Sequence, residues 1–111
     1  MDNQANALLP RHMACSHREE IVARWFFLTR EKMPQLAAEC GWPVRFDHCF
    51  QRILLDNAVS GVWRDVIPAP AYRNATDAQL LAATDLGERV VRGEADLAEL
   101  NRRSLAWRKK A

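Results

Sequence analysis

The sequence predicts an all-α fold, a compact bundle of about five helices with one long irregular connection that contains proline. Two capping-box patterns, Ser16 with Glu19 and Thr76 with Gln79, mark helix starts. Apolar residues recur at helical spacing after them, and no stretch alternates apolar and polar residues as a half-buried strand would. With 111 residues, 49% hydrophobic and 27% charged, the chain has the size and composition of one globular domain.

The first part of the chain is expected to contain a mobile arm and two helices. Residues 1–15 lack periodicity and Pro10 interrupts them, so we expect an arm there and a single helical domain over residues 16–111. The first helix should begin at the first capping box. Pro34 fits the first position of a second, short helix that Gly41 closes.

A third helix is predicted to start near Phe46 and to form the centre of the fold. On a helical wheel one arc is apolar and comprises Phe46, Cys49, Phe50, Ile53 and Leu54. The opposite arc comprises His48, Gln51, Arg52 and Leu55. Asn57 falls within the apolar arc, so either the helix ends near it or its amide is buried and needs hydrogen-bond partners from the next segment.

The second half of the chain is predicted to hold an irregular segment and two further helices. Residues 61–75 lack periodicity, and Pro68 and Pro70 exclude a regular helix and favour an extended path. Connections this long are more often functional than short ones. The second capping box opens a helix to about residue 92, with Gly87 where another backbone should approach closely. The last helix, about residues 95–109, has one face of Leu97, Leu100, Ser104 and Trp107.

Charge is distributed unevenly along the chain, whose net charge is +2. Five of the sixteen basic residues follow the last acid, Glu99, and they are Arg102, Arg103, Arg108, Lys109 and Lys110. Residues 1–101 therefore carry eleven basic and fourteen acidic groups, or −3. No apolar run approaches the roughly 20 residues of a membrane span, and the polar opening lacks the features of an export signal. We therefore expect a cytoplasmic protein of bacterial type, without a membrane partner and with reduced cysteines.

No metal, cofactor or catalytic site is predicted. Every His and Cys lies between His12 and Cys49, but their spacing matches no pair typical of zinc ligands. His48 and Cys49 are adjacent, yet on a helix they diverge by about 100°, so they do not form a thiol–base pair. The four glycines are isolated from one another, whereas loops that bind phosphate are rich in glycine.

Three segments carry a resemblance to other sequences: FDHCFQRILLDNAVSGVW, PAYRN and LNRRSLAWR. They resemble segments of short proteobacterial reading frames labelled as GCN5-related N-acetyltransferases, over most of the chain. The glycine-containing pyrophosphate loop of that enzyme family, with its preceding strand, has no counterpart here. The resemblance implies acyl transfer. We carry a small-molecule or acyl-transfer enzyme as an alternative, with a candidate pocket bounded by His48, Arg52, Asn57 and Tyr72.

A second alternative is DNA binding of the helix-turn-helix type. Leu36-Ala37, Gly41 and the helix after them resemble the start of that motif. The candidate phosphate contacts are the basic residues of the C-terminus, Arg102, Arg103, Arg108, Lys109 and Lys110. On a helical wheel these side chains point in separate directions and form no continuous stripe.

The preferred interpretation is a non-enzymatic protein that binds a macromolecular partner, a protein rather than DNA, through the segment after the central helix. Trp63, Arg64, Tyr72 and Arg73 belong to residue types enriched at interface hot spots, and prolines stiffen the segment that holds them. Phe27 falls on the polar side of the first helix and is a further candidate contact. An alternative role for the loop aromatics is to fill the core.

Overall fold

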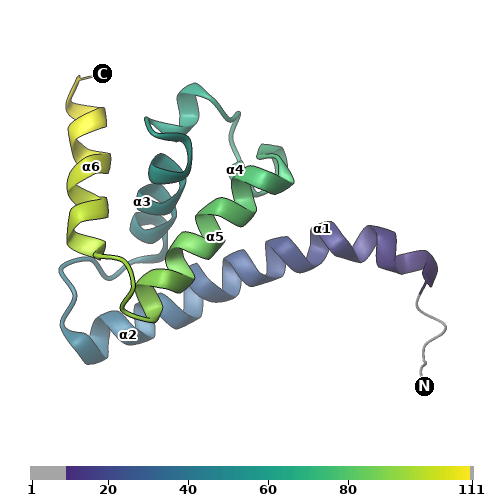
Figure 1. Cartoon of the computed structure of the whole chain (residues 1–111), viewed down its shortest axis with the longest axis horizontal. Coiled ribbons are helices and arrows are strands. Elements are labelled where there is room, and N and C mark those ends of the chain that lie inside the picture. Colours follow the sequence, from purple (N-terminus) through teal and green to yellow (C-terminus); the bar gives the residue numbers. More distant parts are fainter. Residues whose placement is uncertain (1–9, 111) are drawn as a thin grey trace.

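The computed structural model of the chain describes residues 10–110, with side chains from His17 to Lys109. Within this range the fold is an all-α bundle without strands, as the sequence predicts (Figure 1). In chain order its elements are α1 (Pro10–Phe27), the π-helical segment η1 (Leu28–Lys32), α2 (Met33–Cys40), α3 (Asp47–Val59), the 3-10 turn η2 (Trp63–Asp65), α4 (Ala71–Asn74), α5 (Asp77–Val91) and α6 (Leu97–Lys110). Over these described residues, none of the helices has both the length and the apolar character of a bilayer span.

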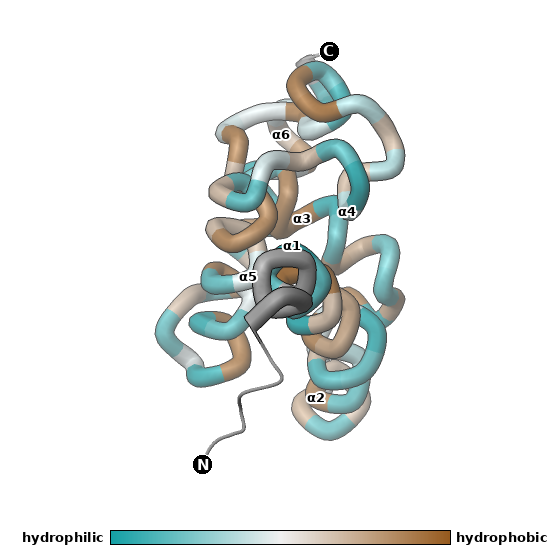
Figure 2. Tube along the Cα trace, turned by 90° about the vertical axis from the view of Figure 1, so that its right-hand side faces the viewer, coloured by the Kyte–Doolittle hydropathy of each residue, from teal (hydrophilic) through white to brown (hydrophobic). Residues whose placement is uncertain are grey.

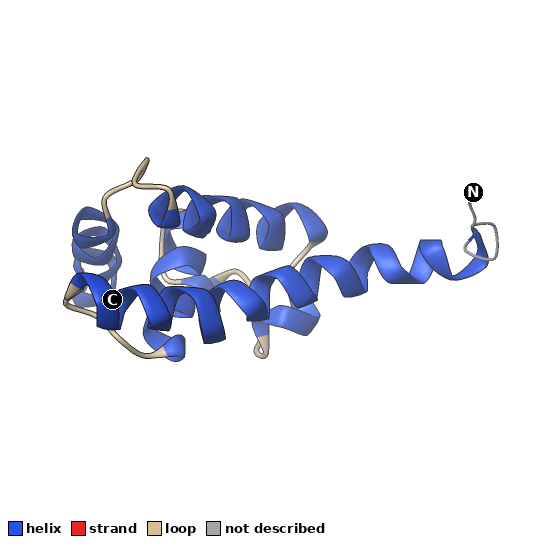
Figure 3. Cartoon of the chain, turned by 90° about the horizontal axis from the view of Figure 1, so that it is seen from below, coloured by secondary structure: helices blue, strands red, loops and turns tan. Residues whose placement is uncertain are grey.

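Helix α1 already begins at Pro10, so the predicted helix start at Ser16 is wrong. The described residues start at Pro10 and are helical from there, so residues 10–15 of the expected arm belong to α1. Residues 1–9, the rest of the expected arm, lie outside the described residues. The first half of α1 extends beyond the other helices (Figures 1 and 3).

The π-helical segment η1 joins α1 to α2 without interrupting the helical path. Pro34 has no N–H and cannot donate to the carbonyl of Arg30, which would be its α-helical acceptor. One residue earlier, the N–H of Met33 donates to the carbonyl of Leu28 across the wider π-helical turn. The predicted end of the second helix at Gly41 is confirmed, and its φ of 68° is the left-handed conformation that glycine adopts without steric cost.

Helix α3 lies at the centre of the fold and packs against η1, α5 and α6. The arc predicted to be apolar supplies three fully buried residues, Phe50, Ile53 and Leu54. Hydrophobic residues recur along this helix in Figure 2. Phe46 was predicted in the same arc but is 64% exposed, because it stays extended as the N-cap and the helix begins only at Asp47.

Burial extends further around α3 than the helical wheel predicts. Leu55, which was assigned to the polar arc, is 2% exposed, and Asp56 is fully buried. Five elements contact this helix, since η2 and α2 also pack against it. A helix that is covered on several sides buries polar residues as well, and each of them then needs a hydrogen-bond partner.

Helix α5 packs along α1 and α3. Its predicted capping box is confirmed, because the Gln79 N–H donates to Thr76 Oγ1 and the Thr76 N–H donates to Gln79 Oε1. The close approach predicted at Gly87 comes from side chains and not from a backbone. A Cβ at Gly87 would lie 2.5 Å from Leu28 Cδ2 and 2.8 Å from Leu54 Cδ1. The missing side chain therefore lets three helical segments meet.

Polar contacts hold α1 against α5 and α4. Arg24 Nη2 lies 2.9 Å from Glu88 Oε1 and 3.3 Å from Asp85 Oδ1. Its hydrogen bond to Glu88 is the largest of the effects that raise the pKa of the Arg24 guanidinium above its ordinary value. One turn and a half earlier in α1, Arg18 Nη2 donates to the carbonyl oxygen of Tyr72 at 2.8 Å. This contact fixes the start of α4 on α1.

The predicted irregular connection over residues 61–75 contains no long helix. It does contain two short helical segments that the sequence did not predict, the three-residue 3-10 turn η2 and the four-residue α4. Pro70 is compatible with α4 because it is the N-cap and precedes the first helical residue. Ile67 is 1% exposed and anchors the connection in the core. The predicted buried face of the last helix is confirmed in α6 for Leu97, Leu100 and Ser104, and Trp107 is half-buried.

Candidate functional site

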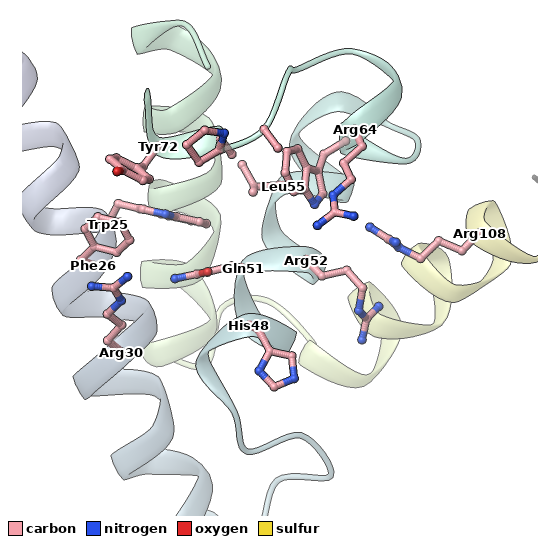
Figure 4. Close-up of a pocket in the computed structure, with 14 residues that line it drawn as sticks. Trp25, Phe26, Arg30, His48, Gln51, Arg52, Leu55, Arg64, Tyr72 and Arg108 are labelled. Atoms are coloured by element: carbon pink, nitrogen blue, oxygen red, sulfur yellow. The ribbon is translucent and has the colours of Figure 1, made fainter. Parts of the chain in front are cut away.

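A cavity of about 490 Å³ opens between α1, α3, α6 and the connection that carries η2 and α4 (Figure 4). We call it the cationic pocket. Its lining residues are Trp25, Phe26, Arg30, His48, Gln51, Arg52, Leu55, Trp63, Arg64, Ala69, Pro70, Ala71, Tyr72 and Arg108. The volume falls within the range of about 300–1,000 Å³ that is typical of ligand sites.

The floor of the cationic pocket is one side of α3. The four residues of α3 that line it are those that the helical wheel placed opposite the apolar arc: His48, Gln51, Arg52 and Leu55. Gln51 is held by Thr29 of η1, whose Oγ1 accepts from Gln51 Nε2 at 3.0 Å. The Thr29 hydroxyl in turn donates to the Trp25 carbonyl at 2.9 Å. The π-helical segment therefore positions a polar side chain on the floor.

Asp56 lies directly behind this floor, and its fully buried carboxylate organises three elements. Arg108 of α6 approaches it with two nitrogens, Nε at 2.8 Å from Oδ2 and Nη2 at 3.1 Å from Oδ1. The Ser104 hydroxyl, also from α6, donates to Oδ2 at 2.6 Å. The backbone N–H of Trp63 in η2 donates to Oδ1 at 2.9 Å. One carboxylate thus fixes α6 and η2 relative to α3.

The same arrangement orients Arg52. Its Nη1 donates to the Ser104 hydroxyl at 2.6 Å, and its Nη2 donates to Asn101 Oδ1 at 2.9 Å. Ser104 therefore accepts from one arginine while it donates to the carboxylate that binds the other. The chain of contacts from Arg52 through Ser104 and Asp56 to Arg108 spans α3 and α6, and its geometry orients both guanidinium groups at the pocket wall.

The lining carries four arginines and no aspartate or glutamate, and one of these arginines, Arg108, is paired with Asp56 behind the wall, so the lining has a net positive charge. Figure 4 shows Arg52, Arg64 and Arg108 gathered at one end of the pocket, with the head groups of Arg64 and Arg108 turned toward each other. Arg30 lies at the other end, with its guanidinium carbon 3.8 Å from the centre of the Phe26 ring. Its contact with Asp47 is long, at 4.0 Å.

Aromatic rings form the wall opposite the three gathered arginines. Trp25, Phe26 and Tyr72 lie together at that end in Figure 4, and the Phe26 and Tyr72 ring centroids are 5.2 Å apart. Trp25 is 2% exposed, so it presents only an edge to the cavity, while Phe26 and Tyr72 are half-buried. The pocket therefore combines three cationic side chains at one end with ring surface and a fourth arginine, Arg30, at the other.

The pocket gathers part of the partner-binding set that the sequence predicts. Trp63, Arg64 and Tyr72 all line it. Arg73 lies beside the Tyr72 ring, 5.8 Å from its centroid, but borders a separate shallow depression next to α1. Phe27 is 56% exposed, as predicted, and belongs to another groove between α1 and α5. These two residues are therefore not part of the cationic pocket.

The candidate small-molecule set divides in the same way. His48 and Arg52 line the pocket, as does Tyr72. Asn57 does not, because its side chain faces α6 and donates to the carbonyl oxygens of Ile53 at 2.8 Å and Leu100 at 2.9 Å. The hydrogen-bond partners predicted for a buried Asn57 amide are thus carbonyl groups of α3 and α6, and not groups of the segment that follows α3.

The basic residues of the C-terminus do not act as one group. Arg108 turns inward to Asp56 and lines the pocket, whereas Arg102 and Arg103 both pair with Glu99 on the surface. Lys109 is exposed, and the Lys110 side chain lies outside the described residues. Among the described side chains, no three His, Cys, Asp or Glu residues lie close enough together to hold a metal ion.

The residues that the sequence did not single out are Asp56, Ser104 and Asn101, together with Trp25, Phe26, Gln51 and Arg30 as pocket lining. Two signals pointed to part of this set. Asp56 follows Arg52 by one helical turn, and Ser104 interrupts the apolar face of the last helix. Neither signal identifies the residue that pairs with Asp56, because that residue is Arg108, 52 positions further along the chain.

No protein-family model, curated protein or solved structure matches this chain. The resemblance to reading frames labelled as acetyltransferases therefore stays a prediction. The fold and the pocket define an all-α domain, over the residues described, with one cavity that is lined by arginines and aromatic rings.

Proposed function

We propose that the protein binds another protein by taking an acidic segment of its partner into the cationic pocket. The observation that carries the proposal is the composition of the lining, which has four arginines and no acidic side chain. Arginine, tryptophan and tyrosine are the residue types that dominate binding energy at protein interfaces, and the pocket contains all three.

Charge complementarity supports the choice of an acidic segment. A positive cleft raises the rate at which a negatively charged partner arrives, and it disfavours partners of the same sign. Outside the pocket, Arg102 and Arg103 of α6 share Glu99 as their ion-pair partner, and Arg24 pairs with Glu88. In the pocket, Arg108 is paired with Asp56 and Arg30 has a long contact with Asp47, whereas Arg64 pairs with no carboxylate among the described side chains.

The arginines are also held in place before a ligand arrives. Asp56, Ser104 and Asn101 fix two of the four arginines, Arg108 and Arg52, by hydrogen bonds of 2.6–2.9 Å, with one further contact of 3.1 Å. Side chains that are already ordered lose less conformational entropy on binding, and such preorganisation increases affinity. The ordering of Arg52 and Arg108 therefore supports a binding site at this end of the pocket.

The DNA alternative has less support from the described residues. Residues 41–46 separate α2 from α3, whereas a helix-turn-helix has a turn of three or four residues. Helix α3, which would be the recognition helix, is the central helix of the fold and is covered by α5, α6 and η1. Two of the candidate phosphate contacts, Arg102 and Arg103, are paired with Glu99.

The test is affinity capture by the full chain from a nuclease-treated lysate of its own host, with Arg64→Glu and Arg73→Glu as matched variants. Both arginines are exposed and lie beside an aromatic ring, but only Arg64 lines the pocket. We expect a captured protein that is lost with Arg64→Glu, kept with Arg73→Glu and released as salt rises. Equal behaviour of the two variants, or capture that nuclease abolishes, would contradict the proposal.

A further inference from the structure

The cationic pocket has two chemically different ends (Figure 4). Arg52, Arg64 and Arg108 come from α3, η2 and α6 and meet at one end. The other end presents rings from α1 and α4, namely Trp25, Phe26 and Tyr72. A ligand that satisfies both ends must carry an anionic group and an apolar or aromatic body.

The charge at the arginine end can be counted. Three guanidinium groups contribute +3 and the carboxylate of Asp56 contributes −1, so the end carries +2. The Arg64 and Arg108 head groups turn toward each other in Figure 4, and an anion placed between two like charges is attracted by both of them. A carboxylate would leave a charge of +1 at this end, whereas a dianion would balance it.

Free hydrogen-bond donors at this end exceed what a carboxylate can use. Arg108 gives Nε and Nη2 to Asp56, so its Nη1 remains available to a ligand. Arg52 gives one hydrogen bond from each terminal nitrogen and keeps its Nε. Arg64 has no acceptor among the described side chains, and its guanidinium carbon lies 5.2 Å from the Trp63 ring centre. A carboxylate offers two oxygens, and a phosphate ester offers three along with about −1.5 to −2 charges.

We propose that the pocket recognises a phosphorylated aromatic side chain, the phosphotyrosine of a partner protein. The phosphate lies among Arg52, Arg64 and Arg108, and the tyrosine ring lies against the aromatic end. This inference rests on the proposed function, since it names the residue by which the partner is held. Arginine clusters are the common means by which proteins bind phosphorylated side chains, because guanidinium groups bind phosphate oxygens in pairs.

The first test compares four ligands of the full chain by fluorescence polarisation or calorimetry. They are a short neutral peptide with one phosphotyrosine, the same peptide with tyrosine, the same peptide with glutamate, and adenosine monophosphate. We expect the phosphopeptide to bind at least about tenfold more tightly than each of the others. Glutamate binding as tightly as phosphotyrosine, or the mononucleotide binding more tightly, would overturn the inference.

The second test locates the phosphate with Arg64→Ala and its matched control, Arg73→Ala. Both side chains are exposed, so both variants should keep the fold, which circular dichroism verifies. Loss of a charge-assisted pair should weaken phosphopeptide binding by about tenfold or more in Arg64→Ala and leave it unchanged in Arg73→Ala. Equal affinities of the two variants would place the phosphate elsewhere and overturn the assignment.

A third measurement separates failure of this inference from failure of the proposed function. The lysate for affinity capture is divided, and one half is treated with a tyrosine phosphatase before capture. Loss of the captured protein after treatment supports the inference. If capture depends on Arg64 but is unaffected by phosphatase treatment, the phosphotyrosine inference is overturned, while the proposed binding of an acidic protein segment still holds. If the phosphopeptide binds but no protein is captured, the proposed function is overturned, while recognition of phosphotyrosine by the pocket is still supported.

Discussion

Arg108, near the end of the last helix, binds the fully buried carboxylate of Asp56 at the centre of the fold, with Nε 2.8 Å from Oδ2. The two residues are 52 positions apart. Their contact joins α6 to α3 and places a guanidinium group at the wall of the cationic pocket. The same carboxylate receives the Trp63 N–H, so the residue before Arg64 is fixed by it as well. Asp56 therefore contributes both to the packing of α6 on α3 and to the position of the pocket residues Arg108 and Arg64.

The first prediction concerns Arg108→Ala. Removing Arg108 leaves the buried carboxylate of Asp56 without its counter-charge. The expected cost is about 3 kcal/mol, at the lower end of the usual range, because Arg108 is partly exposed and Asp56 keeps Ser104 and Trp63 as donors. Arg103→Ala is the matched control, since Arg103 pairs with Glu99 on the surface and should cost less than about 1 kcal/mol. Urea denaturation measures both. Equal losses of stability would show that the Asp56 contact is not special.

The second prediction concerns the double variant Asp56→Leu with Arg108→Met. A well-packed apolar pair often replaces a buried ion pair at little cost, but a leucine at position 56 leaves the Ser104 hydroxyl and the Trp63 N–H without their acceptor, so we expect this variant to be no more stable than Arg108→Ala. Anion binding should also fall, because a pocket arginine is lost and Arg52 and Arg64 lose the carboxylate that orders their surroundings. Retention of full phosphopeptide affinity in a folded double variant would show that Asp56 does not organise the site.

The third prediction concerns Gly87→Ala in α5. Helix propensity alone predicts that this change stabilises the protein by up to about 1 kcal/mol. The new Cβ would instead lie 2.5 Å from Leu28 Cδ2 and 2.8 Å from Leu54 Cδ1, and crowding in a packed core costs about 1–3 kcal/mol. We therefore expect a net loss of stability. Ala82→Gly, at an exposed position of the same helix, is the control and isolates the propensity effect. A stabilised Gly87→Ala protein would contradict the close packing.

The fourth prediction concerns the capping box at the start of α5. Thr76→Ala removes the oxygen that accepts from the Gln79 N–H at 3.0 Å, and loss of such a cap costs about 1 kcal/mol. Thr76→Ser keeps an equivalent oxygen and should retain most of the stability. Thermal denaturation compares the two, and similar melting temperatures of the alanine and serine variants would indicate that the cap contributes little.

The sequence predicts the fold better than the site, and α3 explains why. Its helical wheel correctly separated Phe50, Ile53 and Leu54 from the arc that becomes the pocket floor. A wheel gives the direction of each side chain but not the element that covers it. The contact between Asp56 and Arg108 depends on how α6 returns to α3, which is a long-range property of packing that local periodicity does not encode.

Local rules also failed where two signals competed. The Ser16 and Glu19 pattern predicts a helix start, yet α1 is already helical from Pro10, because serine and glutamate also fit the interior of a helix. Proline likewise suggested an extended path after α3, but as an N-cap Pro70 is compatible with α4. In both places the residue type alone does not determine where the residue lies relative to the start of the helix.

The most direct test of the central claim, that the partner binds at the cationic pocket, is photo-crosslinking in the host cell. A photoreactive amino acid replaces His48, which lines the pocket and whose side chain is 76% exposed, or Phe27, which is 56% exposed on another face. We predict a crosslinked protein of discrete size from position 48 and none from position 27. A crosslink from position 27 with none from position 48 would contradict the account.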